Sequence, residues 1–400
     1  MDTTAGIGHA DVSTTAALLR RLLPPELLPF FDASFIRSHV LYGEFVHRLA
    51  LQVVRDTGLD EAMREPGSPR EIAVRANLEA GQALVPLDGM LRLLAARGSI
   101  EELAGEAGPR YRSRRPVPAL DPAPVREEQR RHEPSWMPAY ALAEIVARDY
   151  PAFLRGKVTG EEVLFSARRL RLWIDYFSND NGLYAVNNRV GAVAAERWLP
   201  RSGGVILELG GGLGSGALAL LERLEAAGRL GTVAGYRFTE LVPAFLRRGE
   251  QTLRARYPAW PGLAFGPLDM NRPLAPQGVA PGSVSVVYAV NTLHVARDLD
   301  FTLGEVLRAL EPGGCLAASE CVRQRHPNYA EFVFNLTEVF RSPRLDSLHR
   351  PAGGFLTPGQ WQGAIEAAGF REVRFLPDIV RIHEQVPDFG VAAIGASRPA

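Results

Sequence analysis

Hydrophobic residues in the second half of the chain form short runs that alternate with longer amphipathic segments. The runs that predict strands lie near residues 205–209, 233–239, 263–268, 284–290, 314–320, 372–376 and 390–397. The segments between them have helical spacing. This alternation predicts an α/β fold, in which helices cover both faces of a parallel sheet and a ligand lies at the carboxyl ends of the strands.

The first half of the chain has mainly helical spacing. Apolar positions predict helices from Leu27 to about Leu59, over 71–76 and over 87–97, followed by a Gly-rich stretch and a possible wing at Tyr111–Arg115. The prolines between Arg115 and Pro124 predict a linker. Beyond it, Trp136–Phe153 and Glu161–Phe177 predict two amphipathic helices. Residues 1–20 begin small and polar, and we expect them to be frayed.

A Gly-rich turn connects the first predicted strand to a helix at Val205–Gly216. Its spacing is Glu208-x-Gly210-x-Gly212-x-Gly214, so the backbone can turn sharply and approach a ligand. Free amides at the helix start suit an anion, such as a pyrophosphate or the carboxylate of a methionine moiety. A carboxylate buried at Glu208 fits an ammonium or sulfonium ligand better than a diphosphate. The alternative is that the glycines only permit tight packing.

Composition excludes several classes of function. Lys plus Arg and Asp plus Glu both number 45 in 400 residues, which argues against a protein that coats nucleic acid or an anionic membrane. No apolar run has membrane-spanning length, and the N-terminus lacks signal-peptide order. Cys315 and Cys321 lie at opposite ends of one predicted strand, so we expect no disulfide and a cytoplasmic location. We expect no metal either, because no His, Asp and Glu cluster has ligand spacing.

Further motifs follow the glycine turn in order along the chain. They are Phe238–Leu246, Leu268–Pro273 with Gln277 and Gly278, Val287–Leu299, and Leu310–Gly314 before a strand that ends at Glu320. With them the chain resembles the class I S-adenosylmethionine-dependent methyltransferases, and most of all the C-methyltransferase domains of polyketide synthases. The resemblance covers roughly residues 165–397. It implies a Rossmann-like seven-stranded sheet that ends in an antiparallel hairpin.

The resemblance also implies which residues bind the cofactor, S-adenosyl-L-methionine. Glu240 follows the second strand, where it would take two ribose hydroxyls, and Asp269 would contact the adenine amino group. Tyr184 and Asn188 would lie over the cofactor, although their segment could instead be an Asx-rich turn with Tyr184 capping the core. The full set is Tyr184, Asn188, Glu208, Gly210, Gly212, Gly214, Glu240, Leu241, Asp269, Met270 and Asn291.

His294 and Glu320 are the candidate catalytic residues. His294 lies just beyond the fourth predicted strand, and Glu320 ends the neighbouring strand at the same edge of the sheet. A lone histidine is more often a surface or capping residue, but a carboxylate beside an imidazole fixes its tautomer and stabilises its protonated form. In the C-methyltransferases that this chain resembles, such a pair acts on the substrate's α-carbon. The carbon between a ketone and a thioester is acidic enough for one imidazole to deprotonate.

The N-terminal pattern resembles the winged-helix domain of small-molecule O-methyltransferases, which forms dimer contacts and covers the substrate. Arg112, Arg114 and Arg115 could alternatively read DNA, but arginines beside Glu101, Glu102 and Glu106 are more often a solvated turn. We therefore expect no nucleic-acid partner and a possible homodimer. The predicted domains are a helical, winged-helix-like domain over 1–115, a linker and helical lid over 116–190, and the cofactor-binding domain over 191–400.

Two departures from the C-methyltransferase pattern concern the substrate. Val295 and Ala296 follow His294, where the family commonly has Ala-Thr. Residues 321–356 replace the family's substrate-covering insertion without its paired tryptophans; they include Arg323, Arg325, His326, Tyr329, Phe332, Asn335 and Phe340.

The predicted function is methylation of the α-carbon of a β-ketoacyl-type thioester on an acyl carrier protein, in natural-product biosynthesis. One alternative is a small-molecule O-methyltransferase in which His294 deprotonates a hydroxyl. A second alternative is a non-catalytic cofactor-binding partner of a synthase.

Overall fold

The computed structural model describes residues 9–106, 108–323, 328–346 and 348–400. Its internal contacts group the chain into two compact units. The helical unit contains the described parts of Met1–Val12, Ala33–Tyr176 and Gln324–Arg341, and the sheet unit contains Ser13–Asp32, Phe177–Arg323 and Ser342–Ala400. The division into domains 1–115, 116–190 and 191–400 stays a prediction.

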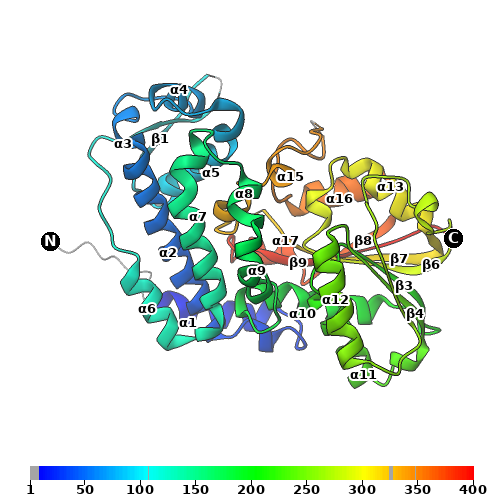
Figure 1. The fold of residues 1–400 in the computed structure, drawn as a ribbon. Helices are drawn as coiled ribbons and strands as arrows, with labels where there is room; N and C mark the ends of the chain where they lie inside the picture. The colour runs from blue at the N-terminus through cyan, green and yellow to red at the C-terminus, as the bar shows by residue number, and fades with distance from the viewer. Residues whose placement is uncertain (1–8, 107, 324–327, 347) are drawn as a thin grey trace. The chain divides into compact units, whose positions relative to one another are not determined.

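The sheet unit is built on seven strands in the order β5-β4-β3-β6-β7-β9-β8. Figure 1 shows this sheet among the helices of its unit. Strands β3 to β7 pair in parallel, whereas β9 runs antiparallel to both β7 and β8. The α/β class, the parallel core and the terminal antiparallel hairpin are thereby confirmed. The strands are β3 Gly204–Leu209, β4 Val233–Thr239, β5 Leu263–Gly266, β6 Val284–Val290, β7 Leu310–Cys321, β8 Arg371–Leu376 and β9 Val391–Ser397.

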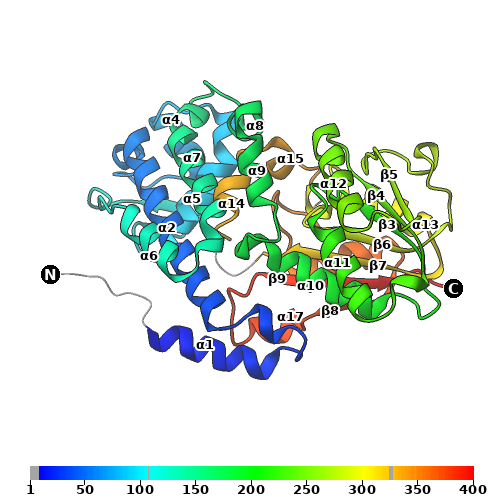
Figure 2. The same cartoon turned by 60° about the horizontal axis from the view of Figure 1, so that its bottom comes forward.

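The hydrophobic pattern explains where the strands and helices of this unit lie. Every residue of β6 is buried, as expected for a continuous apolar run in the middle of a parallel sheet. Apolar side chains of three helices share one core with Ile206, Tyr236, Phe238 and Tyr288 of the sheet. Figure 2 shows the ribbons of these helices beside the strands. These helices are α10 Gly182–Trp198, α11 Ser215–Ala226 and α12 Pro243–Arg256, and the others include α13 Leu299–Ala309, α16 Pro358–Ala367 and α17 Ile379–His383.

The helical unit forms around the long helix α2, Ala33–Thr57, which packs against α6 and α7. Aromatic rings fill this contact, and the ring centroids of Phe45 and Tyr140 are 4.3 Å apart. A two-stranded antiparallel sheet joins β1, Glu101–Leu103, to β2, Arg110–Arg112. The winged-helix interpretation stays a prediction. The helices are α3 Leu59–Ala62, α4 Pro69–Arg75, α5 Ala80–Ala96, α6 Ala123–His132, α7 Met137–Leu154, α8 Gly160–Phe165, α9 Leu170–Tyr176, α14 Glu331–Phe334 and α15 Glu338–Arg341.

Two sequence-based expectations about local structure are wrong. Of residues 1–20, the segment expected to be frayed, 1–8 lie outside the described residues and the others belong to α1, His9–Leu22. This helix forms because Ala16, Leu19 and Leu23 recur at helical spacing and are buried. The single helix expected over Glu161–Phe177 is divided into α8 and α9. The break occurs where the Trp173 indole donates to the Leu164 carbonyl and its ring stacks on Phe165, so tertiary packing replaces the helix's own hydrogen bonds.

None of the helices in the described ranges is long and apolar enough to cross a membrane.

Candidate functional site

The glycine turn after β3 is the centre of the site. Gly210, Gly212 and Gly214 have positive φ angles of 60°, 58° and 89°, a conformation that other residues adopt only at a cost. A Cβ at Gly210 would meet the Thr292 side chain at 2.5 Å, whereas a Cβ at Gly212 would meet nothing within 4 Å. The turn therefore packs tightly on its β6 side and is open at Gly212.

Glu208 lies under this turn, with 1% of its surface exposed. Its Oε2 atom is buried and has no hydrogen-bond partner among the described residues, and neither does the buried Oδ1 atom of Asn188. Burial raises the pKa of Glu208 to about 8, against smaller effects of the Tyr236 hydroxyl and the Ala217 amide. Both side chains face Gly216, where a Cβ would lie 3.1 Å from Glu208 Oε1 and 3.6 Å from Asn188 Oδ1.

Two buried acceptor oxygens without donors indicate a ligand that supplies N–H groups, because buried polar atoms are normally hydrogen-bonded. An ammonium group satisfies both the missing donors and the missing positive charge. The residues present therefore fit the amino-acid end of S-adenosylmethionine.

Glu240, the residue after β4, holds the turn through its carboxylate. The Gly212 amide donates to Oε2 at 2.9 Å, and the Val242 amide donates to Oε1 at 2.8 Å. A carboxylate accepts about four hydrogen bonds, so this arrangement leaves acceptor capacity for hydroxyl groups. Leu241, which follows it, is 55% exposed. The ribose contact of Glu240 stays a prediction.

Tyr184 and Asn188 lie on α10, near the same acids. Burial raises the pKa of Tyr184, and the charges of Glu208 and Glu240 add to the shift. Asn188 donates to the Asn179 side chain at 2.8 Å, and Asn179 donates to the Ser215 carbonyl at 2.9 Å. The polar segment before α10 therefore connects that helix to the start of α11.

Asp269 and Met270 follow β5, in a loop that Gln277 holds. The Gln277 side chain accepts from the Asp269 amide at 2.8 Å and donates to the Asp269 carbonyl at 2.9 Å. This explains the Leu-Asp and Gln-Gly motif as a clamp. Asp269 accepts from the Asn271 amide at 2.9 Å and keeps a quarter of its side chain exposed. Thr302 donates to the Met270 carbonyl at 3.0 Å.

Asn291 ends β6 and redirects the chain toward His294. Its φ angle is 49°, a left-handed conformation that asparagine tolerates better than most residues. Its amide donates to the Ser319 carbonyl at 2.8 Å, and its side-chain oxygen accepts from the Cys321 amide at 2.9 Å. These bonds to β7 fix the short 3-10 helix Leu293–Val295, which carries His294.

His294 and Glu320 meet in the structure. The Nδ1 atom of His294 lies 2.6 Å from Oε2 of Glu320, and the two residues are 6% and 0% exposed. The other carboxylate oxygen accepts from the amides of Leu293 at 2.8 Å and Thr292 at 3.1 Å. Because a carboxylate accepts but does not donate, Nδ1 carries the proton and the neutral ring has its lone pair on Nε2.

Two further residues beside His294 were missed by sequence reasoning. The Phe355 ring lies 4.9 Å from the imidazole, and the Arg350 guanidinium donates to the His294 carbonyl. Both belong to the segment 321–356, but they follow no periodic pattern that would have identified them. Tyr329, Phe332, Asn335 and Phe340 of that segment belong to the helical unit, and Arg325 and His326 lie outside the described residues.

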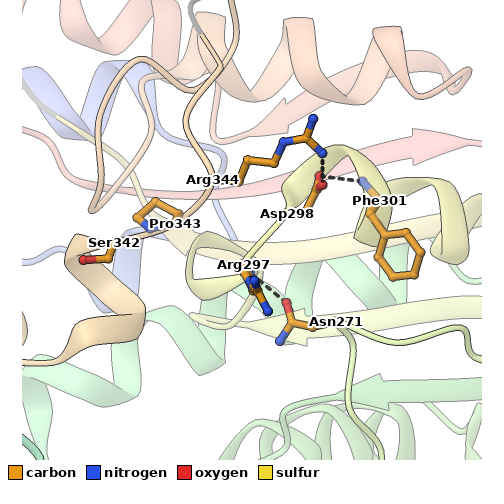
Figure 3. Close-up of a pocket in the computed structure, with 7 residues that line it drawn as sticks. All are labelled: Asn271, Arg297, Asp298, Phe301, Ser342, Pro343 and Arg344. Atoms are coloured by element: carbon orange, nitrogen blue, oxygen red, sulfur yellow. Dashed lines mark hydrogen bonds and ion pairs between the residues drawn. The ribbon is translucent and has the colours of Figure 1, made fainter.

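A cavity of about 540 Å³ lies where the loops after β5 and β6 meet residues 342–344 (Figure 3). Arg344 pairs with Asp298, the N-cap of α13, and Asn271 accepts from the Arg297 amide at 2.7 Å. The lining residues are Asn271, Arg297, Asp298, Phe301, Ser342, Pro343 and Arg344. Among the residues that the structure describes, no group of three or more His, Cys, Asp or Glu side chains could hold a metal ion.

Sequence comparison finds similarity to segments of polyketide synthases. The chain is 30% identical over 258 residues to a reducing polyketide synthase of Preussia isomera. This match covers 64% of this chain and 10% of that protein. It is 29% identical over 330 residues to a non-reducing polyketide synthase of Macrophomina phaseolina, covering 76% of this chain and 14% of that protein. The chain thus spans a small fraction of the length of these relatives. No protein-family model matches it.

Solved structures share the fold over almost the whole chain. The CurJ carbon methyltransferase is 21% identical, with a TM-score of 0.76 over 96% of this chain and 99% of its own. The DszA carbon methyltransferase is 22% identical, with a TM-score of 0.69 over 99% and 97%. The trans-methyltransferase CalH in complex with SAH is 18% identical, with a TM-score of 0.60 over 90% of each chain. The resemblance to polyketide synthase C-methyltransferase domains is confirmed.

Proposed function

Because the chain has the fold of class I S-adenosylmethionine-dependent methyltransferases and resembles polyketide synthase C-methyltransferase domains, we propose that it methylates the α-carbon of a β-ketoacyl-type thioester carried by an acyl carrier protein. The observation that carries this proposal is the buried contact between His294 and Glu320 at 2.6 Å. The contact lies at the same edge of the sheet as the glycine turn, since β3 and β6 are parallel neighbours.

The cofactor would be held by the residues around the glycine turn. S-adenosylmethionine supplies an electrophilic methyl group when bound. Glu208 and Asn188 have unpaired buried oxygens for its ammonium group, and Gly212 leaves the turn open. Glu240, Leu241, Asp269, Met270 and Asn291 follow strand ends along the same edge, and Tyr184 lies near the two acids. This set is the proposed cofactor site.

His294 is the proposed base. Glu320 keeps the proton on Nδ1, so Nε2 can take the α-proton of the thioester. The resulting imidazolium is stabilised by the same carboxylate, which is fully buried and therefore interacts strongly. Glu320 itself is held by two backbone amides, so the pair needs little rearrangement before reaction.

Similarity to synthase segments supports a carrier-bound substrate and a place in natural-product biosynthesis. The cytoplasmic location and the homodimer stay predictions.

The proposal is tested with purified protein, labelled S-adenosylmethionine and an acetoacetyl thioester of an acyl carrier protein. We expect the wild type to add one methyl group, which intact mass detects and which stays on the acyl chain after base hydrolysis. His294→Ala should abolish transfer and retain S-adenosylhomocysteine binding. His132→Ala, which removes a histidine of the helical unit that bonds to Ser34, is the matched control.

Two other results would contradict the proposal. A base-labile methyl group would indicate O-methylation, and cofactor binding without transfer to any thioester or hydroxyl acceptor would indicate a non-catalytic partner.

A further inference from the structure

Arg350 is a buried arginine whose backbone pairs with that of Asp346. It is 2% exposed, and it exchanges two backbone hydrogen bonds with Asp346, at 3.0 and 2.9 Å. The Asp346 carboxylate accepts from the amides of Leu348 and His349 at 3.1 and 3.0 Å. The loop therefore presents the Arg350 side chain from a defined position.

The guanidinium of Arg350 has donors left over. Nη2 donates to the carbonyl of His294, but Nε and Nη1 are buried without a hydrogen-bond partner among the described residues. Arg350 forms no ion pair with a described carboxylate. A buried cation normally has hydrogen-bond partners for all its N–H groups and a carboxylate to pair with, because removing a charge from water is costly. Unpaired N–H groups beside the candidate base therefore indicate a ligand that brings an oxygen with negative charge.

The surroundings of Arg350 leave its guanidinium charged and exclude water from it. Burial lowers the pKa of Arg350 to about 10, with Glu320 opposing the shift and Arg323 adding to it, so the group stays charged at neutral pH. Phe355 packs against the His294 ring from the same loop and excludes water on that side. Hydrogen bonds to charged groups are stronger in such an environment than in water.

We propose that Arg350 donates a hydrogen bond to the substrate carbonyl oxygen that becomes negative when His294 takes the α-proton. The proposal rests on the proposed function and narrows its substrate to enolisable acyl compounds. The C–H bond breaks, its proton goes to Nε2 of His294, and its electron pair is delocalised onto the carbonyl oxygen. The α-carbon would then form its C–C bond to the methyl group with this electron pair, and the carbonyl would be restored. The bond between sulfur and the methyl group would break, and its electron pair would stay on the sulfur of the leaving S-adenosylhomocysteine.

This geometry disfavours a hydroxyl acceptor. In O-methylation the charged oxygen is itself the nucleophile, and a strong hydrogen bond from a guanidinium would make it less reactive. In C-methylation the stabilised oxygen and the attacking carbon are different atoms. Stabilisation of the developing oxyanion therefore lowers the barrier to proton removal.

The test measures proton removal separately from methyl transfer. The N-acetylcysteamine thioester of acetoacetate is incubated in deuterated buffer with enzyme and S-adenosylhomocysteine, and α-proton exchange is followed by NMR above the enzyme-free rate. Methyl transfer is measured in parallel. We expect Arg350→Gln, which keeps a donor for the His294 carbonyl but no charge, to slow exchange and kcat by about 10²–10³-fold with KM changed less than about threefold.

Arg350→Lys restores a charge but has one ammonium group in place of the planar guanidinium, so both rates should lie between those of Arg350→Gln and the wild type. Arg254→Met removes an exposed arginine of the same unit and should change neither rate by more than about twofold. Melting temperature and S-adenosylhomocysteine affinity show which variants are folded. If Arg350→Gln is not folded, Arg350→Lys provides the test.

Wild-type exchange in a folded Arg350→Gln protein, or a loss confined to KM, would overturn the role of Arg350 alone. If Arg350→Lys is the only folded variant, an exchange rate within about twofold of the Arg254→Met rate would overturn it. A wild type that neither exchanges the α-proton nor transfers a methyl group would instead reject the proposed function.

Discussion

The two halves of the candidate site differ in how completely their carboxylates are hydrogen-bonded. At the β3 edge, Glu208 has an unpaired buried oxygen and a pKa raised to about 8 by burial. At the β6–β7 edge, Glu320 is equally buried, but it accepts from two backbone amides and contacts His294. Two equally buried carboxylates therefore differ in the number of hydrogen-bond donors that the fold supplies to them.

This difference separates a binding role from a catalytic one. The Glu208 half lacks donors that a ligand can bring, so ligand binding completes it. The Glu320 half is complete without a ligand and holds the imidazole in one tautomer, as a base must be held before its substrate arrives. Changes in the first half should act on cofactor affinity, and changes in the second should act on turnover.

Among the changes that test this comparison, Glu320→Gln has the largest expected effect. The side-chain oxygen of the introduced glutamine must face the amides of Leu293 and Thr292, so its NH₂ group faces Nδ1 of His294. The imidazole then has to accept at Nδ1, which moves its proton to Nε2 and removes the base. We expect kcat for methyl transfer to fall by about 10²–10⁴-fold.

Isothermal titration of the same variant with S-adenosylhomocysteine provides its control. The affinity should stay within about twofold of wild type, since Glu320 lies outside the proposed cofactor set. A variant that keeps wild-type turnover, or that loses cofactor affinity as much as turnover, would contradict the separation of the two halves.

Glu208→Gln should have the opposite profile. The amide has the shape of the carboxylate but no charge for an ammonium group, so S-adenosylhomocysteine affinity should fall by about 10- to 100-fold at pH 8. The turnover number at saturating cofactor should change much less. A variant with unchanged affinity would show that the unpaired oxygen of Glu208 does not meet the cofactor.

The raised pKa of Glu208 predicts a pH dependence of the same affinity. Below pH 8 the ligand-free acid is mostly protonated, and binding an ammonium ligand has to release that proton. Affinity should therefore rise with pH up to about 8, by at most about tenfold per pH unit. Burial and the charge of Glu208 raise the pKa values of Tyr184, Tyr236 and Tyr288, so these hydroxyls stay neutral throughout.

The sign for stability is the reverse of the sign for affinity. The folded-state pKa of Glu208 lies above its ordinary value of 4.5, so its contribution to stability is lost as pH rises from 4.5 toward 8. Glu208→Gln should remove the pH dependence of both affinity and stability. Titration of the ligand's own amino group affects wild type and variant equally, so it cancels when the two proteins are compared. Parallel pH profiles for the two proteins would contradict this assignment.

The sequence predicted the parts of this site that depend on strand order. Glu208, Glu240 and His294 each lie at or just beyond the end of an apolar run, and parallel strands bring such positions to one edge. The contact between His294 and Glu320 could be predicted for the same reason. These inferences needed only the period of the hydrophobic pattern and one recognised family resemblance.

The parts that sequence reasoning missed depend on loop paths and on packing. Arg350 reaches His294 from 56 residues away through a loop without periodicity. The break between α8 and α9 depends on the Trp173 indole, which no helical pattern reveals. Local spacing predicts elements well, but the destination of an irregular loop is set by tertiary contacts that leave no regular trace.

The smallest expected effect tests whether the open side of the glycine turn belongs to the ligand. Gly212→Ala and Gly58→Ala both place a side chain at a positive φ, 58° and 74°, and in both cases the new Cβ meets nothing within 4 Å. Each should therefore destabilise the protein by a similar amount, roughly 1–2 kcal/mol, which thermal unfolding measures. Gly58 lies in the helical unit at the start of α3, away from the glycine turn in sequence and fold. Only Gly212→Ala should also weaken S-adenosylhomocysteine binding, by a fewfold to tenfold, because its methyl group would occupy the space that the ligand needs; equal affinities in the two variants would place the ligand elsewhere.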